Sequence, residues 1–588
     1  MKKTLRQMLL ASALLASSAA AAAAVQTVVW EGEGVPTPSP LATQVDVAAF
    51  IFPGWGVADP ASIGAGGEWP SLFPDPSVRP LLGFYNDALP VVNDWHIYWA
   101  RQFGVSLFIH NWYWNNGQQI LVDQLEQGFL QAQHREHMDF AIQWSNHPIP
   151  QAWGANTPLR FDRQAMLDVT DYWIANYFHQ PNYRKINGRP LVIIFDPLPV
   201  IAQNGGVAGW KVTLGQMNAR MAAAGLGPLF LAATNFDAQA MKAAGFDAIT
   251  GYSTHGIPPV CPAWRTGPGY RVPFAYMVES THRVYKMFER QHGVLDMIVP
   301  SGTGWDDSYR HPQMTGTKFT TGFSPASFEA MISASLQAVP AQGLRMVVFD
   351  AWNEWTEGSY LEPTKRFGFG MLEAVARTYG AGPVPEQVFI PSVDDAIALS
   401  NFPREQWLAM WNLPLDTPLP PHINLPMVPS GVRCLGLAEE PAGGIVWQWA
   451  FGSGASPTLT NGQTIPSPDG FSYIPTTTDP QLSWTIPPMD VSEITAISFE
   501  LRVNAPTDDP VELFHAPPGE SFVADRAFSM RAPDGADWVT VGVDVADYTD
   551  WSGQIGAIRL DIGVPGQQVT VRRARIQGSG SPVGWKVR

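Results

Sequence analysis

Eight short apolar segments recur between residues 47 and 355, and longer segments with a helical spacing of apolar residues separate them. The apolar segments are rich in Val, Ile, Phe and Ala and alternate little with polar residues, which is typical of strands in a parallel sheet covered on both faces. The separating segments, such as DQLEQGFLQAQHREHM and SFEAMISASLQAV, are amphipathic and predict helices. The predicted strands span residues 47–55, 104–114, 139–148, 189–197, 229–235, 247–254, 297–306 and 345–355.

Eight strand–helix units predict an α/β fold, a (β/α)8 TIM barrel with a ring of helices outside eight parallel strands. A doubly wound open sheet is the alternative arrangement for the same pattern. It is disfavoured because no Gly-rich dinucleotide-binding fingerprint follows the first strand. The predicted barrel domain spans residues 25–405.

The pattern changes after the predicted barrel. Residues 406–434 are Pro-rich and have the composition of a semi-rigid linker. Residues 435–588 contain short alternating runs, such as AISFELRVN and DWVTVGVDV, separated by Gly, Pro and Asp turns. They predict an all-β sandwich, a jelly roll. We expect this domain either to bind carbohydrate or to brace the barrel, and aromatic residues exposed on one face would favour binding.

The N-terminus predicts a signal peptide over residues 1–24. MKKTLRQ is basic, and the following MLLASALLASSAAAAAA is apolar and ends in small residues. A membrane anchor is the alternative, but the strongly apolar part is short for a bilayer span. We therefore expect a secreted or periplasmic monomer without a membrane span.

The formal net charge of −16 narrows the range of partners. Nucleic-acid binding needs a basic surface, so we expect no nucleic-acid partner. The same charge argues mildly against a polyanionic substrate, although a local basic patch could override the average. Only two cysteines are present, Cys261 and Cys434, so no disulfide framework holds the fold. Whether these two pair is left open, since their separation in sequence does not give their distance.

Aromatic and polar residues collect where the predicted strands end. In a (β/α)8 barrel the carboxyl ends of the strands form the active-site face, so we expect these residues to line its mouth. Indoles stack on the apolar faces of sugar rings, although a single Trp more often packs in a core. The predicted substrate-binding residues are Trp55, Tyr85, His110, Trp112, Trp144, Asn146, Tyr252, His255, Trp305, Asp306, Arg310, Asn353 and Trp355.

The last predicted strand runs into AWNEWTEGSYLEP, which places Glu354 and Glu357 three residues apart on a turn. Paired carboxylates cleave glycosidic bonds when one donates a proton and the other stays ionised. Their close spacing fits a retaining rather than an inverting enzyme. The alternatives are solvated loop acids or metal ligands. Metal ligation is disfavoured because no His or Cys lies nearby and Asp350 is the one additional carboxylate close before the pair.

These motifs resemble glycoside hydrolase family 99 and its wider relatives, which include the WbsX-type group often labelled glycosyltransferase-like. NEWTEG followed by LEP resembles the family signature, and FPGW, RPLLGFYND, FGVSLFIHNWYW, AIQWSNHP, GFDAITGY and GWDDSYRHP follow the family's order. The chain departs at His147, where the wider group often has Glu, and at WDDSYR, where many members have WDNTxR. The C-terminal domain resembles the galactose-binding-like jelly rolls found beside polysaccharide-active barrels.

The resemblance implies a retaining α-glycosidase with endo-α-mannosidase-like chemistry on a polysaccharide or oligosaccharide. Glu354 would then act as the base towards the substrate 2-hydroxyl, which attacks the anomeric carbon to give a 1,2-anhydrosugar. Glu357 would act as the acid and then as the base. A 2-hydroxyl trans to the leaving group, as in an α-manno sugar, is therefore implied.

No cofactor and no catalytic metal are expected, because the chain shows no Cys/His ligand cluster and no nucleotide-binding loop. A structural Ca²⁺ near Asp534, Asp544 and Asp547 of the predicted sandwich stays open. Two rival functions also stay open. A glycosyltransferase would need an activated sugar donor, and a non-catalytic glycan-binding protein would have no need of both glutamates.

Overall fold

A computed structural model describes most of the chain. The residues outside the description are 1–24, 57–67, 148–158, 253, 255–269, 307–308, 310–317, 322, 415–432, 435–443, 453–455, 478, 505–510, 523–526, 531–536, 546–552, 564 and 579–588. The predicted signal peptide, most of the predicted linker, Cys261, His255, Arg310, Asp534 and Asp547 fall in these ranges. In the described part of the chain, no helix is both long and apolar enough to span a bilayer.

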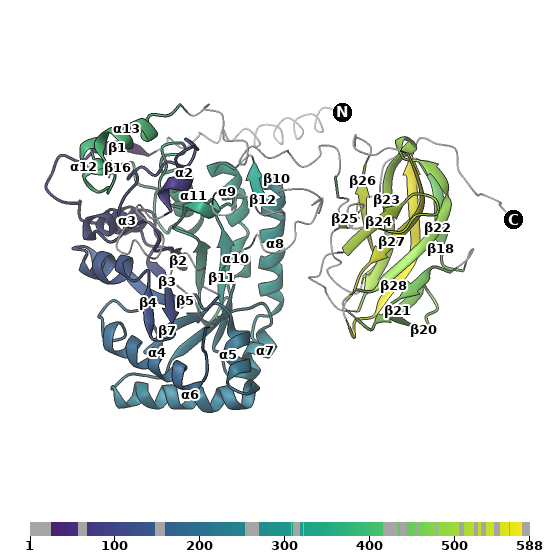
Figure 1. Ribbon diagram of the computed structural model, residues 1–588, viewed down its shortest axis with the longest axis horizontal. Helices are drawn as coiled ribbons and strands as arrows, with labels where there is room; N and C mark the ends of the chain where they lie inside the picture. The colour runs from purple at the N-terminus through teal and green to yellow at the C-terminus, as the bar shows by residue number, and fades with distance from the viewer. Residues whose placement is uncertain are drawn as a thin grey trace, which may run out of the picture.

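The first domain is a closed barrel of eight parallel strands (Figure 1), as the sequence predicts. The sheet closes because the first strand pairs with both the second and the last. The strands are β2 (Asp46–Ile51), β3 (Leu107–Asn115), β5 (Asp139–Trp144), β7 (Arg189–Ile194), β8 (Phe230–Thr234), β9 (Ala248–Thr250), β11 (Asp296–Gly302) and β13 (Met346–Asp350).

Helices cover the outside of this barrel (Figure 1). They are α2 (Trp69–Leu72), α3 (Pro90–Gln102), α4 (Arg163–Asn176), α5 (Pro197–Gln203), α6 (Gly206–Ala223), α7 (Ala238–Ala244), α8 (Phe274–Arg290), α9 (Pro325–Ile332), α10 (Ser335–Ala338), α11 (Gly370–Tyr379), α12 (Val393–Ala398) and α13 (Arg404–Trp411). Trp407 of α13 is fully buried in the same core as the barrel helices, so this folded unit extends to α13.

One predicted helix is absent. The segment DQLEQGFLQAQHREHM forms three short non-α turns instead, η1 (Gln124–Gly128), η2 (Phe129–Gln131) and η3 (Arg135–His137). Gly128 lies so close to α3 that a Cβ there would come within 2.4 Å of the Asn93 amide nitrogen. A glycine lowers helix propensity, and this close packing fixes the local path of the chain.

Small strand pairs complete the first domain. They are β1 (Gln26–Val29) with β16 (Gln387–Ile390), β3 with β4 (Gln118–Ile120), β7 with β6 (Lys185–Ile186), β10 (Tyr270–Pro273) with β12 (Lys318–Thr321), and β14 (Asn353–Glu354) with β15 (Ser359–Tyr360).

The faces of the barrel strands alternate as the two-residue period of a strand requires. In β2, Ala48 and Phe50 belong to the core inside the barrel, whereas Val47, Ala49 and Ile51 belong to the core between strands and helices. Both faces are apolar, so the strands read as continuous hydrophobic runs in the sequence.

The second domain is a β-sandwich of two antiparallel sheets around one hydrophobic core, in agreement with the all-β prediction. The larger sheet has the order β17-β26-β23-β28-β21-β20 with β18 beside β28, and the smaller has the order β19-β22-β27-β24-β25. The strands are β17 (Arg433–Cys434), β18 (Gly444–Ala450), β19 (Thr458–Thr460), β20 (Gly462–Ile465), β21 (Phe471–Pro475), β22 (Gln481–Asp490), β23 (Ile494–Val503), β24 (Val511–Ala516), β25 (Ala527–Met530), β26 (Val539–Asp544), β27 (Gln554–Asp561) and β28 (Val569–Gly578).

Candidate active site

The two predicted catalytic glutamates lie on a tight turn directly after β13. Glu354 ends the short strand β14, and a single 3-10 turn, η5 (Trp355–Glu357), follows. Glu354 is buried with 4% of its surface exposed, whereas Glu357 is partly exposed. Gly358 ends the turn with φ of +63°, a left-handed conformation that favours glycine. The turn therefore presents two acids of different exposure at the carboxyl end of the barrel.

A chain of hydrogen bonds inside the barrel ends on Glu354. The Gln143 side-chain amide donates to Asn111 Oδ1 over 3.1 Å, and Asn111 Nδ2 donates to the Tyr252 hydroxyl over 2.6 Å. The Tyr252 hydroxyl in turn donates to Glu354 Oε2. Gln143 lies on β5, Asn111 on β3 and Tyr252 just after β9. We call these four residues the mouth network.

The mouth network supplies Glu354 with a hydrogen-bond donor that keeps its proton. Burial first, and then the charges of Glu354, Asp350 and Glu357, raise the pKa of Tyr252 well above its usual value. The Tyr252 hydroxyl therefore keeps its proton and remains a donor. A hydrogen bond donated to a carboxylate stabilises its charged state, and the Tyr252 hydroxyl is placed to give Glu354 such a bond.

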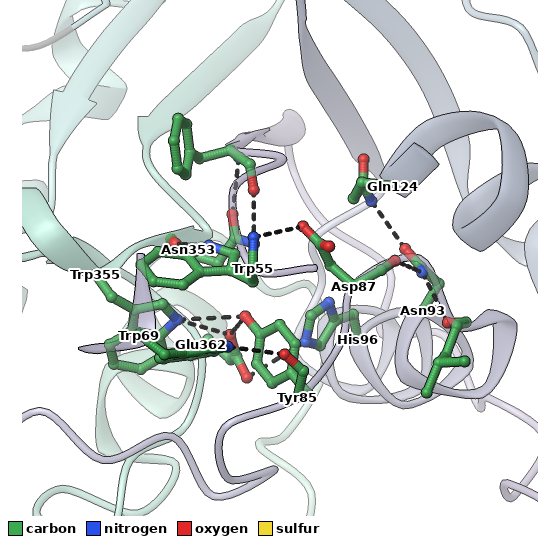
Figure 2. Close-up of polar contacts among 12 residues, drawn as sticks. Trp55, Trp69, Tyr85, Asp87, Asn93, His96, Gln124, Asn353, Trp355 and Glu362 are labelled. Atoms are coloured by element: carbon green, nitrogen blue, oxygen red, sulfur yellow. Dashed lines mark hydrogen bonds and ion pairs between the residues drawn. The ribbon is translucent and has the colours of Figure 1, made fainter. Parts of the chain in front are cut away.

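Hydrogen bonds between side chains and backbone groups fix the chain on the N-terminal side of Glu354. Asn353 Oδ1 accepts from the Phe52 amide over 2.8 Å, and Asn353 Nδ2 donates to the Phe52 carbonyl over 3.1 Å. The Trp55 indole donates to the Asn353 carbonyl over 2.9 Å (Figure 2). Asn353 and Trp55, both predicted to bind substrate, thus join the turn to the segment after β2.

A third glutamate, Glu362, follows β15 and is completely buried. The Tyr85 hydroxyl donates to Glu362 Oε2 over 2.7 Å, and the Trp355 indole donates to the same oxygen over 3.3 Å. His96 Nε2 of α3 lies 3.3 Å from Glu362 Oε1 (Figure 2). We call Tyr85, His96, Trp355 and Glu362 the anchor cluster. It holds the indole of Trp355, which lies between Glu354 and Glu357 in the sequence.

A buried aspartate lies next to the anchor cluster. Asp87 Oδ2 accepts from the Trp55 backbone amide over 3.1 Å (Figure 2). Burial, and to a smaller extent the charge of Asp123, raises the pKa of Asp87 to about 7. The segment that carries Trp55 is therefore joined to a carboxyl group that titrates near neutrality.

Three predicted mouth residues point away from the barrel interior. His110 and Trp112 alternate with Asn111 on β3 and therefore face the helix layer. His110 Nδ1 bonds Gln124 Oε1 over 2.8 Å, and burial lowers the pKa of the His110 ring to about 4. The Trp112 indole donates to the Tyr177 hydroxyl over 3.1 Å, and Trp144 packs against Trp173 of α4. The structure does not bring these three side chains to the glutamates.

Trp305 and Asp306, predicted at the end of the seventh barrel strand, do lie beside the turn. The Asp306 backbone amide donates to the Glu357 carbonyl, and both side chains are partly exposed. Asn146 is buried and bonds both backbone polar groups of Asp196 over 2.6 Å, so it joins two loops. Among the predicted substrate-binding residues, four contact the glutamate turn from other segments of the chain: Tyr252, Asp306, Trp55 and Tyr85.

The prediction missed Gln143, Asn111 and Glu362 as site residues. The signal for the first two was the strand period, since Asn111 shares its face with Ile109 of the inner core and Gln143 shares its face with Ala141. Glu362 lies in the LEP run that resembles the family signature, but the strand period gave no sign of a site role for it, because its partners come from distant segments. In the described part of the chain, no group of three or more His, Cys, Asp or Glu side chains is placed to hold a metal ion.

The fold and the site define a class: a (β/α)8 barrel that presents a pair of glutamates at the carboxyl ends of its strands. The family model described as Glycosyltransferase WbsX matches residues 74–375, just over half of the chain. The chain therefore belongs to the WbsX family, in agreement with the resemblance of its motifs.

Other proteins are more distantly similar. A protein of Xanthomonas campestris pv. campestris, described as Uncharacterized protein WxcX, is 25% identical over 326 residues, or 53% of this chain and 44% of that protein. This chain thus matches less than half the length of that relative. A solved GH99 endo-alpha-mannosidase from Bacteroides thetaiotaomicron is 15% identical, with a TM-score of 0.38, over 57% of this chain and 96% of that one. A structure described as Glycoside hydrolase-like protein is 14% identical, with a TM-score of 0.41, over 60% and 98%.

Proposed function

We propose that the protein is a glycoside hydrolase that cleaves α-glycosidic bonds in a polysaccharide with retention of configuration. The observation that carries this proposal is the mouth network, because its chain of hydrogen bonds ends on Glu354 while Glu357 stands more exposed on the same turn. In this proposal the buried Glu354 acts as the ionised carboxylate and the more exposed Glu357 as the acid that reaches the leaving group, which is the division of roles that glycosidases use.

In the first step Glu354 removes the proton from the substrate 2-hydroxyl, and that oxygen attacks the anomeric carbon. The bond from the anomeric carbon to the leaving oxygen breaks, and Glu357 gives its proton to that oxygen. The product is a 1,2-anhydrosugar, with Glu354 protonated and Glu357 ionised. Tyr252 remains hydrogen-bonded to Glu354 and holds it in place.

In the second step Glu357 removes a proton from water, which attacks the anomeric carbon. The bond from this carbon to O2 breaks, and O2 takes back the proton from Glu354. Both glutamates return to their starting states. Two inversions at the anomeric carbon give overall retention. No cofactor enters either step, so turnover should persist in EDTA at a temperature at which the protein stays folded.

The substrate must carry a 2-hydroxyl trans to the leaving group, which an α-mannan has and an α-glucan lacks. We therefore expect release of reducing ends from an α-mannan and not from an α-glucan, with sulfated and deoxy-sugar polysaccharides completing the panel. Proton NMR of the first product should show the α-anomer before mutarotation. Release of the β-anomer would overturn the retaining mechanism.

A glycosyltransferase is the second candidate, because the matching family model is described as Glycosyltransferase WbsX. A transferase needs a nucleotide- or lipid-linked donor, which is scarce where the N-terminal segment is expected to send the chain. Calorimetric titration with nucleoside diphosphate sugars separates the two: heat of binding, followed by sugar transfer to an acceptor, would favour the transferase.

We also infer that the N-terminal segment directs export. Fusion of residues 1–30 to a phosphatase that is active only outside the cytoplasm tests this inference. Phosphatase activity in whole cells supports export, and a silent reporter overturns it.

A further inference from the structure

Four arginines cluster on the outer face of the larger sheet of the sandwich. On β23, Phe499 and Leu501 point into the hydrophobic core, so Arg502 and Glu500 point outward. On the neighbouring strand β28, Ala574 and Ile576 point inward, so Arg573 and Arg575 point outward. A register shift between these strands adds Arg572 to the same face, where it bonds Glu500. We call Arg502, Arg572, Arg573 and Arg575 the arginine face.

The carboxylates on this face leave the arginines in excess. Glu500 pairs with both Arg572 and Arg573, the latter over 3.1 Å, and the arginines keep the pKa of Glu500 below its usual value. Asp469 pairs with Arg502 over 2.9 Å. Glu500 and Asp469 thus form ion pairs with three of the four guanidinium groups, so two carboxylates are shared among three arginines.

An aromatic ring completes the face. The guanidinium carbons of Arg502 and Arg572 lie 4.9 and 4.1 Å from the centre of the Trp538 ring. Such cation–π contacts hold the guanidinium groups in a fixed arrangement. The side chains of Arg502, Arg572 and Arg573 nevertheless remain about one third exposed, so their donors are accessible to a ligand.

We propose that the arginine face binds an acidic polysaccharide, one that carries carboxylate or sulfate groups along its length. Arginine presents a planar fork of donors that matches both kinds of anion. Side chains two residues apart on one strand face are separated by about 7 Å, so successive arginines can meet successive charges of one polymer. Several weak contacts on one chain then add up through effective concentration.

The net negative charge of the whole chain makes the local cluster of arginines significant. With 36 Lys and Arg against 52 Asp and Glu, the protein as a whole repels a polyanion. Attraction to one must therefore come from a local site. The proposed binding is independent of the reaction in the barrel, and the assay below measures binding alone.

Affinity electrophoresis of the full-length protein tests the proposal with three polymers. Dextran sulfate supplies sulfate, polygalacturonate supplies carboxylate, and uncharged dextran is the control. We expect retardation by at least one acidic polymer, weakened at high salt, and none by dextran. Comparison of the two acidic polymers identifies the preferred anion. Equal mobility in all three gels would overturn the proposal.

Two variants locate the site. The double change Arg502→Gln and Arg573→Gln should weaken binding about tenfold, if each lost contact contributes near 0.7 kcal/mol. Arg160→Gln with Arg404→Gln removes the same charge from exposed positions on the barrel domain and should leave the affinity unchanged. Equal losses in the two double variants would show a general charge effect and overturn the site.

A third variant should act in the opposite direction. Glu500→Gln removes the carboxylate that Arg572 and Arg573 share, so these arginines become available to the polymer. We expect tighter binding than that of the unmodified protein. Thermal unfolding of each variant checks that the sandwich stays folded. A weaker affinity of a folded Glu500→Gln protein would contradict the arginine face.

Discussion

Glu354 and Glu362 both follow β13, eight residues apart in the chain, but their surroundings differ. The Tyr252 hydroxyl, which itself accepts from Asn111, donates to Glu354 from the barrel interior, and the more exposed Glu357 stands on the same turn. Glu362 is enclosed by Tyr85, Trp355 and His96 and has no exposed surface. A carboxylate that is to react must remain reachable, whereas a fully enclosed carboxylate can only fix its neighbours. The comparison separates a reacting role from a positioning role for chemically identical side chains.

The largest expected effect is the loss of turnover when either Glu354 or Glu357 is replaced. Glu354→Gln and Glu357→Gln should each lower turnover about 10²- to 10⁴-fold, because each removes a positioned acid or base. The melting temperature should change little, since Gln keeps the shape of Glu. Initial rates and calorimetry on the same samples check both points. Near-normal turnover of a folded variant would contradict the assignment.

Substitutions in the anchor cluster should lower the stability of the protein, whereas those at Glu354 and Glu357 should lower its turnover. Glu362→Ala should lower the free energy of unfolding by about 3 kcal/mol, because it leaves buried polar partners without their acceptor. Glu362→Gln keeps a carbonyl acceptor for Tyr85 and Trp355 and should cost less. Urea unfolding of both variants measures the difference. If both variants lose turnover at unchanged stability, Glu362 is not an anchor.

Asp87, next to the anchor cluster, should make the stability of the protein depend on pH. Its pKa is about 7 in the folded protein against 3.8 in an exposed setting. Because the folded state holds this proton more tightly, Asp87 contributes stability that is full below about pH 4 and is lost as the pH rises through about 7. The contribution should fall by about 2 kcal/mol between pH 5 and 7.

The variant Asp87→Asn cannot titrate and should lose this part of the pH dependence. Asp168→Asn, a change at an exposed helical position, controls for the removal of one charge. Melting temperatures at pH 5, 6 and 7 compare the three proteins. Identical slopes in all three would show that Asp87 is already ionised in the folded state.

The smallest effect distinguishes two tyrosines that both donate to a glutamate. Tyr252→Phe should lower kcat about tenfold, the equivalent of one charge-assisted hydrogen bond. It should also move the acidic limb of the pH–rate profile upward, since the ionised form of Glu354 loses a donor. Tyr85→Phe should instead cost about 1 kcal/mol of stability and leave kcat unchanged. The assignment would be reversed if Tyr252→Phe lowered only the stability and Tyr85→Phe lowered only kcat.

The barrel could be predicted from the sequence because all eight strands are buried on both faces and appear as apolar runs. The glutamate pair could be found because it follows the last of these runs. The orientation of strand-end residues was harder. His110 and Asn111 are neighbours on one strand, yet the first faces a helix layer and the second faces the mouth.

Composition at a strand end does not reveal this difference, but the two-residue period does once the inward face is known. The anchor cluster could not be predicted in that way. It joins residues from the segment after β2, from α3 and from the turn after β13, and only the closed barrel brings these together.

The glycine that ends the glutamate turn has a consequence for engineering this barrel. A Cβ on Gly358 would lie 2.7 Å from the Asp306 amide nitrogen, and one on Gly304 would lie 2.5 Å from the Gly358 carbonyl oxygen. The Ser359 hydroxyl also donates to the Gly304 carbonyl over 2.6 Å. The loop after β11 is thus fitted to the turn without room for a side chain. Loop grafts intended to change substrate preference should keep residues 303–306 and vary the loops of other strands, because any change of length here would displace Glu357.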